Sequence, residues 1–514
     1  MDQDLALEIL FAGYSAFLTG AAGAGKTYTL NEFVHQSKRS GKKVAVTATT
    51  GIAAAHLGGN TIHAWSGLGV LDTLPRKFFD NLAKGRREQI EKADILIIDE
   101  ISMLHDFRLD LVDDICRQVR ANDSPFGGLQ VVLSGDFFQL PPVVRRDEQP
   151  DYDINELPKT NFAYHSKSWQ NLDPVILYLD SQYRQTDDDF LNILSKIRAG
   201  QITRADAEKI AARYRANLNQ QTEITELHTT NRDVDAINNR HMTALPGEFV
   251  DFTMTHTGSQ NHVDRLKRSC LAPELLQLKK GALVMALKND PERSFANGSI
   301  GIVVGFVDDY PLVQFRNGRK IVVHEASWEL RDGDKKQASL TQVPLRPAYA
   351  ITVHKSQGMT LDAAKINLAN VFEPGMGYVA LSRVKSLDDL SILGLTSNAF
   401  KIHPEVLAQD AKFQRAAKEA KTKYEPLRAN KQARIQKFKK SKTSQGSTAW
   451  AEKLAKMRLT YPNAYTPWAQ ADDEKLTKAF KNGAKVKDLT AQFGRHPGAI
   501  RSRLHKIFGD DIEI

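Results

Sequence analysis

The sequence contains few cysteines: Cys116 and Cys270 are the only two among 514 residues. This scarcity excludes a disulfide-stapled scaffold and a cysteine-rich zinc module, and it is typical of a reducing compartment. Long apolar runs are also lacking, since none approaches the roughly 20 residues that a membrane-spanning helix needs. Residues 1–4 carry no positive charge, so no secretory signal is predicted. We expect a soluble intracellular protein without a membrane partner.

Over most of the chain, neither positive nor negative charge is in large excess. The 70 Lys and Arg residues and 61 Asp and Glu residues give a formal net charge of +9. Residues 411–514 carry 24 basic and 10 acidic residues, so their net charge is +14, whereas residues 1–410 have a net charge of −5. This asymmetry predicts a polyanion-binding tail on a nearly neutral body.

Short apolar runs alternate with longer mixed stretches over the first 180 residues. Runs that are apolar at nearly every position favour strands buried on both faces of a parallel sheet. They occur at residues 14–18, 44–47, 95–98, 131–133 and 175–179. Helical segments fit between them, as at 27–40 and 106–120. The alternation predicts an α/β domain with a parallel sheet.

A second α/β block is predicted from residue 171, with strands at 363–368 and 390–393. Between its halves lie short strands separated by turn signals, which predict a small inserted β-barrel. The predicted domains are therefore 1–170, 171–410 with the inserted barrel at 275–345, a basic linker or helix at 411–460, and a compact all-α module at 461–514.

Residues 20–27 read Gly-Ala-Ala-Gly-Ala-Gly-Lys-Thr and fulfil the phosphate-loop pattern between a predicted strand and a predicted helix. Backbone N–H groups of such a loop face the β-phosphate of a nucleotide at a helix N-terminus. Lys26 would bridge the β- and γ-phosphates, and the Thr27 hydroxyl would hold Mg²⁺. The remaining predicted nucleotide contacts are Gly23, Ala24, Gly25 and Tyr28. We expect ATP and Mg²⁺ as the cofactors.

Two further strand ends carry polar residues suited to nucleotide hydrolysis. Residues 95–100 place Asp99 and Glu100 after a buried strand, where α/β proteins bind ligands. Asp99 would support Mg²⁺, and Glu100 would act as the general base for water. Gln139 follows the strand at 129–134 and could contact the γ-phosphate. The alternatives are a strand that merely leaves the core and a glutamine that merely caps a loop.

Several segments resemble motifs of the Pif-one family of superfamily-one DNA helicases, which are relatives of the RecD-like enzymes. Residues 99–104 and 135–142 are similar to the family's second and third motifs. Other segments resemble its DNA-contacting, arginine-finger and last two motifs: residues 47–54 with 61–63, 182–185, 349–358 and 378–383. The motifs occur in the family's order over roughly residues 3–400.

The resemblance implies a motor of two RecA-like domains with ATP in the cleft between them. Arg184 and Arg383 would enter from the second domain and neutralise transition-state charge, an effect worth roughly 10³–10⁵ in rate. Gln3 lies where the family places an adenine-reading glutamine. Gln357 and Gly358 would lie near the γ-phosphate.

The resemblance also implies an ATP-dependent DNA helicase of the bacterial cytosol or nucleoid, a monomeric motor moving 5′ to 3′ in replication, repair or recombination. Its partners would be single-stranded DNA and forked or tailed duplexes, with a strand-separating wedge at residues 60–90. The matched DNA-contacting candidates are Thr49, Thr50, His63, Thr230, Asn231, Thr352 and His354. One alternative is a DNA-stimulated ATPase that translocates without unwinding. The other is a DNA-binding regulator that uses its ATPase as a switch.

The C-terminal tail predicts a three-helix module of the helix-turn-helix type at residues 461–508. Pro497 suits the first turn of the last helix, whose apolar face leaves Arg501 and Arg503 on other faces. These two residues are the candidates for duplex DNA contact. The alternative is a three-helix bundle that docks a protein. The basic run at 431–442 is interpreted as a solvated tether that adds sequence-independent attraction to DNA.

Overall fold

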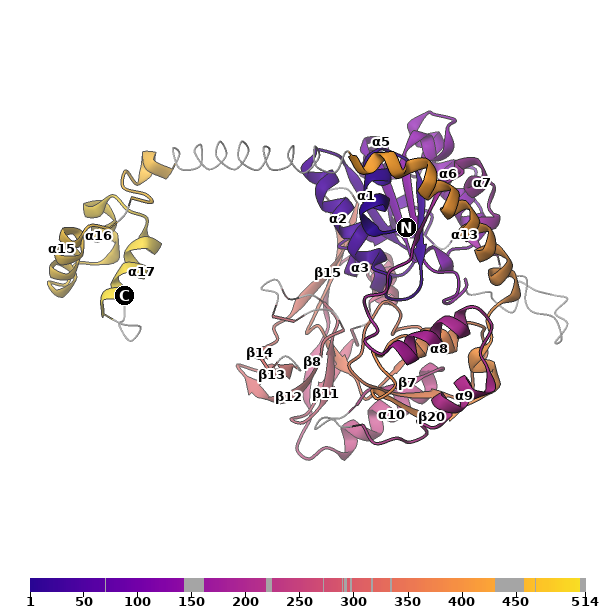
Figure 1. Ribbon diagram of the computed structural model, residues 1–514. Coiled ribbons are helices and arrows are strands. Elements are labelled where there is room, and N and C mark those ends of the chain that lie inside the picture. Colours follow the sequence, from indigo (N-terminus) through magenta and orange to yellow (C-terminus); the bar gives the residue numbers. More distant parts are fainter. Residues whose placement is uncertain are drawn as a thin grey trace. The chain divides into compact units, whose positions relative to one another are not determined.

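The computed structural model describes residues 1–69, 71–142, 161–218, 224–270, 272–288, 290, 294–295, 298–315, 318–332, 335–429, 457–466 and 468–508. It divides into two compact units, Met1–Leu427 and Arg428–Ile514 (Figure 1). Among the described helices, none is both long and apolar enough to span a membrane. The basic run predicted as a tether at 431–442 lies outside the described residues.

The first sheet has six parallel strands in the order β3-β2-β4-β5-β1-β6. Every residue of the two strands β1 and β4 is buried, as expected for strands covered on both faces. The strands are β1 (Ala16–Gly20), β2 (Val44–Ala48), β3 (Asn60–Thr61), β4 (Ile95–Asp99), β5 (Gln130–Ser134) and β6 (Val175–Leu179). Because β6 pairs with β1, the first domain extends beyond the boundary predicted at residue 170.

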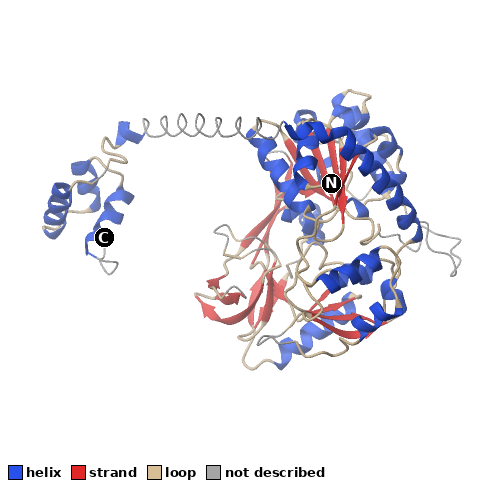
Figure 2. Ribbon diagram, in the orientation of Figure 1, coloured by secondary structure: helices blue, strands red, loops and turns tan. Residues whose placement is uncertain are grey.

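Helices lie on either side of this sheet (Figure 2). They are α1 (Gln3–Phe11), α2 (Lys26–Arg39), α3 (Gly51–His56), α4 (Ile62–Ser66), α5 (Lys84–Lys92), α6 (Asp106–Arg120) and α7 (Lys167–Leu172). The short 3₁₀ helices are η1 (Ile101–Met103), η2 (Pro125–Gly128) and η4 (Ala163–His165). The segment predicted as a wedge, 60–90, thus carries β3, α4 and most of α5.

A second parallel sheet has the strand order β18-β7-β19-β20. Its strands are β7 (Glu226–His228), β18 (Ala350–Thr352), β19 (Ala364–Leu368) and β20 (Leu390–Leu395). The helices of this part are α8 (Asp188–Arg198), α9 (Arg204–Ala211), α10 (Asn231–Ala244) and α12 (Met376–Leu381), with the 3₁₀ helix η5 (Ser397–Phe400). The predicted α/β class with two parallel sheets is therefore confirmed.

An antiparallel insertion separates β7 from β18 in sequence. Its sheets have the strand orders β14-β13-β12-β11-β17, β15-β16-β9 and β10-β8. The elements are β8 (Val250–Thr253), β9 (Thr255–Gly258), α11 (Gln260–Ser269), β10 (Leu275–Leu278), β11 (Leu283–Ala286), β12 (Ile300–Val307), β13 (Tyr310–Phe315), β14 (Lys320–Val322), β15 (Ala326–Asp332), β16 (Lys335–Gln342) and β17 (Leu345–Pro347). The β-rich part thus begins at Val250, before the predicted residue 275.

Helix α13 (Pro404–Tyr424) follows the second sheet and packs back onto the first domain. The Phe413 ring lies 5.2 Å from that of Phe17, and the Tyr424 ring lies 4.8 Å from that of Tyr14. The basic segment predicted at 411–460 is therefore helical at its start, but this part belongs to the core of the first unit. Its lysines obscured an apolar face that only packing reveals. The 3₁₀ helix η6 (Glu425–Ala429) follows it.

Among the described residues of the second unit, residues 457–460 are helical, and three further helices follow: α15 (Gln470–Lys481), α16 (Val486–Phe493) and α17 (Pro497–Phe508). They enclose a small core of their own, made of Leu476, Leu489, Phe493, Ile500 and Leu504. Gly494, with φ of 56°, ends α16 in a left-handed conformation and allows the turn into α17. This arrangement is the three-helix module that the tail sequence predicts.

Candidate functional site

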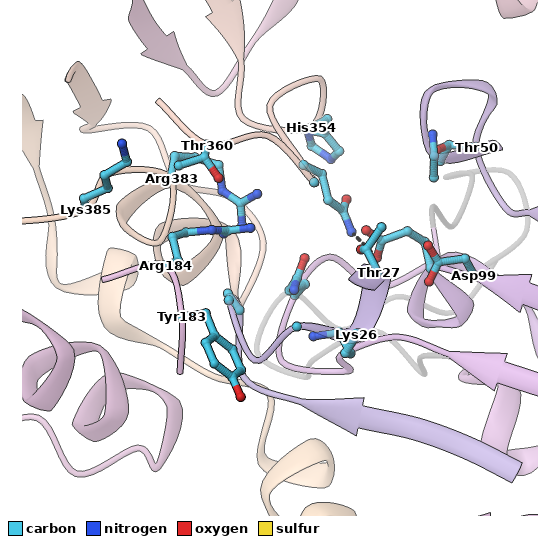
Figure 3. A pocket seen from close by; sticks show the side chains of 18 residues that line it. Lys26, Thr27, Thr50, Asp99, Tyr183, Arg184, His354, Thr360, Arg383 and Lys385 are labelled. Carbon is cyan, nitrogen blue, oxygen red and sulfur yellow. Dashed lines mark hydrogen bonds between the residues drawn. The ribbon is translucent and has the colours of Figure 1, made fainter. Parts of the chain in front are cut away.

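A cavity of ≈ 450 Å³ lies between the two parallel-sheet domains. Figure 3 shows Lys26, Thr27 and Asp99 on one side of it and Arg184 and Arg383 on the other. The first domain contributes Ala22, Gly23, Gly25, Lys26, Thr27, Thr50, Ala53, Asp99, Glu100 and Gln139. The residues after β6 contribute Tyr183, Arg184, His354, Gln357, Gly358, Thr360, Arg383 and Lys385. The cavity thus collects most of the residues predicted to bind nucleotide.

The loop between β1 and α2 depends on glycine at two positions. Gly23 and Gly25 have φ values of 90° and 87°, which disfavour other residues. A Cβ at Gly23 would lie 2.7 Å from Arg184 Cβ, and one at Gly25 would lie 2.1 Å from Gln3 Nε2. Gln3 Nε2 donates a hydrogen bond to the Gly25 carbonyl at 3.4 Å. The predicted adenine-reading residue therefore contacts the phosphate loop.

Lys26 opens helix α2 and points back into its own loop. Its Nζ donates to the carbonyls of Gly20 at 2.8 Å and Ala21 at 3.2 Å. Burial lowers the pKa of Lys26, while the carboxylates of Asp136 and Glu100 act in the opposite direction. A buried ammonium surrounded by loop carbonyls is suited to receive phosphate oxygens.

Two other predicted contacts lie away from the cavity. The Ala24 side chain is buried in the hydrophobic core, and the Tyr28 side chain is 64% exposed on α2. Neither side chain lines the cavity in the described part of the chain. A contact of these two residues with phosphate would therefore come from their backbone N–H groups.

Asp99 and Glu100 lie where β4 ends. Glu100 has a left-handed backbone conformation, with φ of 54° and ψ of 41°, which turns the chain at the edge of the sheet. Burial, and then the charge of Asp99, raise the pKa of Glu100 from 4.5 to about 7. Burial also raises the pKa of Asp99, while the positive charge of Lys26 acts in the opposite direction. Glu100 thus titrates near neutral pH, where a general base works best.

Two glutamines, Gln357 and Gln139, make hydrogen bonds to carboxylates at or near the cavity. Gln357 Nε2, from the second domain, donates to Glu100 Oε2 at 3.1 Å. Gln139 Nε2 donates to Asp136 Oδ2 at 3.4 Å within the loop after β5. Gly358, with φ of 77°, follows Gln357 and also lines the cavity. Glu100, the predicted general base, is therefore hydrogen-bonded across the cavity to Gln357 of the second domain.

Two arginines from the second side converge on the cavity. Arg184 Nη1 donates to the Ser382 carbonyl at 3.1 Å, and burial lowers its pKa. Arg383 is 1% exposed, and burial followed by the charge of Arg184 lowers its pKa to about 9. Two desolvated guanidinium groups that repel each other are stabilised by an anion between or beside them. The cavity is therefore suited to a polyphosphate.

The residues predicted to hold Mg²⁺ face the same cavity. Thr27 supplies a hydroxyl and Asp99 a carboxylate, and Mg²⁺ prefers oxygen ligands. No group of three or more His, Cys, Asp or Glu residues suited to a metal occurs among the described residues. A phosphate-loop magnesium needs no such group, because phosphate oxygens and water complete its coordination. The donor set therefore fits the predicted ion.

Two of the predicted DNA-contacting residues, Thr50 and His354, line the nucleotide cavity. A third, Thr49, lies next to it, because its Oγ1 donates to the Glu100 carbonyl at 2.9 Å. His354 Nε2 also lies 3.7 Å from Glu373 Oε2. The structure thus places two of these three side chains in the wall of the cavity and the third beside it.

The other DNA-contacting candidates of the unit Met1–Leu427 lie away from the cavity lining. Thr230 caps α10, where its Oγ1 donates to Asp233 Oδ2 at 2.7 Å and Asn231 next to it is exposed. Thr352 is 3% exposed and accepts from the Lys355 N–H at 3.2 Å. His63 lies partly buried in α4, on the segment predicted as a wedge.

In the C-terminal module the two candidate arginines differ. Arg501 is exposed on α17, whereas Arg503 Nε donates to Asp473 Oδ1 at 2.7 Å. The Arg503 guanidinium also lies 5.7 Å from the Trp468 ring centroid. Arg503 therefore joins α17 to α15, and Arg501 is the more accessible of the two.

Sequence reasoning missed several residues of the site. Tyr183, Thr360 and Lys385 line the cavity. Tyr183 directly precedes Arg184, and Lys385 lies two residues after Arg383. Their closeness in sequence to the two predicted arginines could have identified them. The buried ion pair between Asp136 and Arg198 could not be found in this way, because the two residues are distant in sequence.

Comparison with known proteins matches this architecture. A family model described as PIF1-like helicase matches residues 8–208, and one described as the 2B domain of DNA helicase Pif1 matches residues 261–306. The ATP-dependent DNA helicase Pif1 of Psychrobacter sp. (strain PRwf-1) is 36% identical over 93% of this chain and 80% of its own length. The human ATP-dependent DNA helicase PIF1 is 36% identical over 79% of this chain, which spans 62% of the human protein.

A solved structure resembles the fold as well. Pif1 helicase from Bacteroides in complex with ADP-AlF3 and ssDNA has a TM-score of 0.61 and 31% sequence identity, covering 82% of this chain and 97% of that chain. The resemblance seen in the sequence is confirmed, and the chain belongs to the PIF1-like helicase family.

Proposed function

We propose that this Pif1-family ATP-dependent DNA helicase hydrolyses ATP between its two RecA-like domains and moves 5′ to 3′ on single-stranded DNA. One observation carries the proposal: the cavity is lined from both domains. The phosphate loop and Glu100 come from the first domain, whereas Arg184, Gln357 and Arg383 come from the second. Hydrolysis at such a site is coupled to the closing and opening of the domains.

The residues of the cavity divide the chemical work. Glu100, with its pKa raised to about 7, takes the proton of the attacking water, and Gln357 holds its carboxylate in place. Lys26, Arg184 and Arg383 neutralise the charge that develops on the γ-phosphate. Of the remaining candidates, Gln139 senses the γ-phosphate and Gln3 contacts the adenine.

Thr27 and Asp99 would hold Mg²⁺, which when bound neutralises phosphate charge. The Asp99 carboxylate and the Thr27 hydroxyl would be the oxygen groups that the protein offers to the ion. Both side chains line the cavity beside Lys26, which supports the assignment.

Single-stranded DNA is the proposed track, because the Bacteroides relative is described in complex with ssDNA. Thr49, Thr50 and His354 lie at the nucleotide site, so they would link DNA contact to hydrolysis; His63, Thr230, Asn231 and Thr352 complete the proposed path. Hydroxyls and amides suit phosphate contacts that do not read the sequence. The segment 60–90 would separate the strands of a forked or tailed duplex. We propose a monomeric motor acting in the bacterial cytosol or nucleoid, in keeping with the Psychrobacter relative.

The C-terminal module is proposed to contact duplex DNA through α17. The exposed Arg501 supports this role, whereas Arg503 supports it only by holding α17 in place. The high positive charge of residues 411–514 agrees with a polyanionic partner.

Strand displacement on tailed duplexes tests the proposal. ATP-driven displacement from a 5′-tailed duplex, but not from a 3′-tailed one, is expected. ATPase activity that single strands stimulate, without displacement on either substrate, would favour a translocase that does not unwind. ATPase activity indifferent to single strands would favour an ATP-switched DNA-binding regulator. The Lys26→Ala variant serves as the hydrolysis-deficient control.

A further inference from the structure

A buried ion pair crosses the boundary between the two domains at the loop that carries Gln139, one of the residues lining the cavity. Arg198 Nη1, at the end of α8 in the second domain, lies 2.5 Å from Asp136 Oδ1, after β5 in the first domain. The two side chains are 10% and 0% exposed. Arg198 Nη2 also donates to Tyr178 Oη at 3.0 Å, and the guanidinium lies 3.9 Å from the Phe138 ring centroid. The guanidinium is thus held in one orientation.

The Asp136 carboxylate in turn fixes the loop that carries Gln139. Its Oδ1 accepts from the Phe138 N–H at 3.2 Å, and its Oδ2 accepts from Gln139 Nε2 at 3.4 Å. The Asp136 carbonyl accepts from the Gln139 N–H at 2.9 Å. A shift of Arg198 would therefore be passed to Gln139, which lines the cavity.

A second contact crosses the same boundary at the phosphate loop. Tyr378 Oη, from α12 of the second domain, accepts from the Ala22 N–H at 3.1 Å. Tyr378 is 2% exposed, and burial followed by the charge of Asp136 raises its pKa, so the hydroxyl remains neutral. The positive charge of Arg198 acts in the opposite direction and lowers the pKa of the same hydroxyl. The two crossings therefore share one buried cluster.

The start of α12 also touches the Gln139 loop. Gly375, with φ of +86°, precedes the helix, and a Cβ there would lie 2.6 Å from the Phe138 carbonyl oxygen. The same Cβ would lie 2.8 Å from the Gln139 carbonyl oxygen. Glycine thus permits backbone contact between the two domains at this point.

The position of α12 decides where Arg383 can act. Arg383 Nε donates to the Val379 carbonyl within α12 at 2.8 Å, and its Nη2 donates to Ser382 Oγ at 2.8 Å. Its Nη1 donates to the carbonyls of Ser356 at 3.3 Å and Met359 at 3.2 Å. A guanidinium so fully bonded to its own domain moves with that domain, and α12 sets its distance from the phosphate loop.

We propose that Tyr378 and Arg198 are positioning residues that hold the phosphate loop, the Gln139 loop and the Arg383 helix in register when the domains close. This inference rests on the proposed hydrolysis of ATP between the domains. Both contacts join groups of the two domains, so a movement of one domain against the other would strain or break them. A misplacement of about 1 Å in such a site can cost 10²-fold in rate. The two residues thereby tie hydrolysis to domain movement.

The Tyr378→Phe variant keeps the buried ring and removes only the hydroxyl. The loss of one neutral hydrogen bond corresponds to about a 2- to 10-fold fall in the DNA-stimulated kcat. The KM for ATP is expected to stay within about twofold, because the Ala22 N–H is bonded to Tyr378 and not aimed at the nucleotide. ATP consumed per base pair separated is expected to rise. Tyr164→Phe is the matched control, since Tyr164 Oη bonds Glu405 at 2.8 Å in the core between the first domain and α13.

The Arg198→Lys variant keeps the charge and removes the planar fork. This variant is expected to lower kcat more than Tyr378→Phe does. The fall in kcat of the double variant is expected to be smaller than the product of the two single-variant falls, because the two residues act on the same loops. Arg120→Lys is its control, because Arg120 donates to the Gly127 carbonyl at 2.7 Å and to other carbonyls of the first domain.

Wild-type strand displacement is measured beside the variants, so that a failure of the proposed function is recognised independently. A wild-type enzyme that unwinds, with Tyr378→Phe matching Tyr164→Phe in kcat and in ATP used per base pair, would overturn the inference. A fall in kcat that merely follows a fall in melting temperature, equal to that of the controls, would also overturn it. A selective fall in kcat at unchanged melting temperature and ssDNA affinity supports it.

Discussion

The substitution Glu100→Gln should stabilise the nucleotide-free protein at alkaline pH while abolishing ATP hydrolysis. Glu100 lies at the end of β4 beside Asp99, and burial followed by the charge of Asp99 raises its pKa from 4.5 to about 7. An ionised carboxylate there is unfavourable for the folded state. Glutamine has nearly the same shape and stays neutral, so it removes this cost together with the proposed general base.

The sign of the effect follows from the direction of the shift. Below pH 4.5 the Glu100 carboxyl is protonated in the folded and unfolded states, so it contributes no pH dependence. As pH rises from 4.5 to about 7, the unfolded state loses its proton first, and the wild-type protein loses stability. Above about pH 7 the loss is complete. At roughly 1.36 kcal/mol per pKa unit, it amounts to about 3 kcal/mol as an upper limit.

Thermal unfolding of the wild type and the variant at pH 5 and pH 8, without nucleotide, measures this difference. For a domain of this size about 3 kcal/mol corresponds to a rise in melting temperature of roughly 5–10 °C at pH 8, and to little change at pH 5. Glu226→Gln is the opposite control, since its hydrogen bond and charge interaction with His228 outweigh burial and lower the pKa of Glu226. That variant should lose stability at pH 5. Equal melting temperatures of wild type and Glu100→Gln at pH 8 would refute the reasoning.

Three further outcomes are expected. Lys26→Ala should abolish ATP hydrolysis and leave ssDNA binding intact, and near-normal turnover would contradict the phosphate-loop assignment. A chain ending at Leu427 should keep its DNA-stimulated ATPase, whereas one ending at Asp410 should lose about 3–5 kcal/mol because Phe413 no longer fills the core, and identical melting curves would contradict this. Arg501→Ala in the full chain should weaken duplex binding and lower the slope of log K against log salt by about 0.9, and an unchanged slope would exclude a phosphate contact.

The local sequence was enough for much of the site. The glycines and Lys26 of the phosphate loop lie within eight residues, and Asp99 and Glu100 follow one apolar strand. Such signals are local, because a strand end or a helix start is encoded by neighbouring residues. The motif resemblance then joined the first-domain residues to Arg184 and Arg383, which no spacing could have paired.

Boundaries were less predictable than elements. The strand β6 was expected from its apolar run, yet only its pairing with β1 shows that the first sheet continues to Leu179. Helix α13 is rich in lysine, and its attachment to the first domain depends on Phe413 and Tyr424 meeting Phe17 and Tyr14. Sequence composition reports exposure on average, and it does not report which neighbour covers a face.

The sequence alone determined the kind of motor, because the phosphate loop and the strand ends encode their chemistry locally. Tertiary structure alone decided how the two halves of the site are joined. Asp136 and Arg198 are separated by 62 positions, and Ala22 and Tyr378 by 356. Such contacts arise where loops and helices of the two domains meet, and buried polar groups must find partners there. No local pattern of residues encodes these contacts between the domains, so only the tertiary structure shows them.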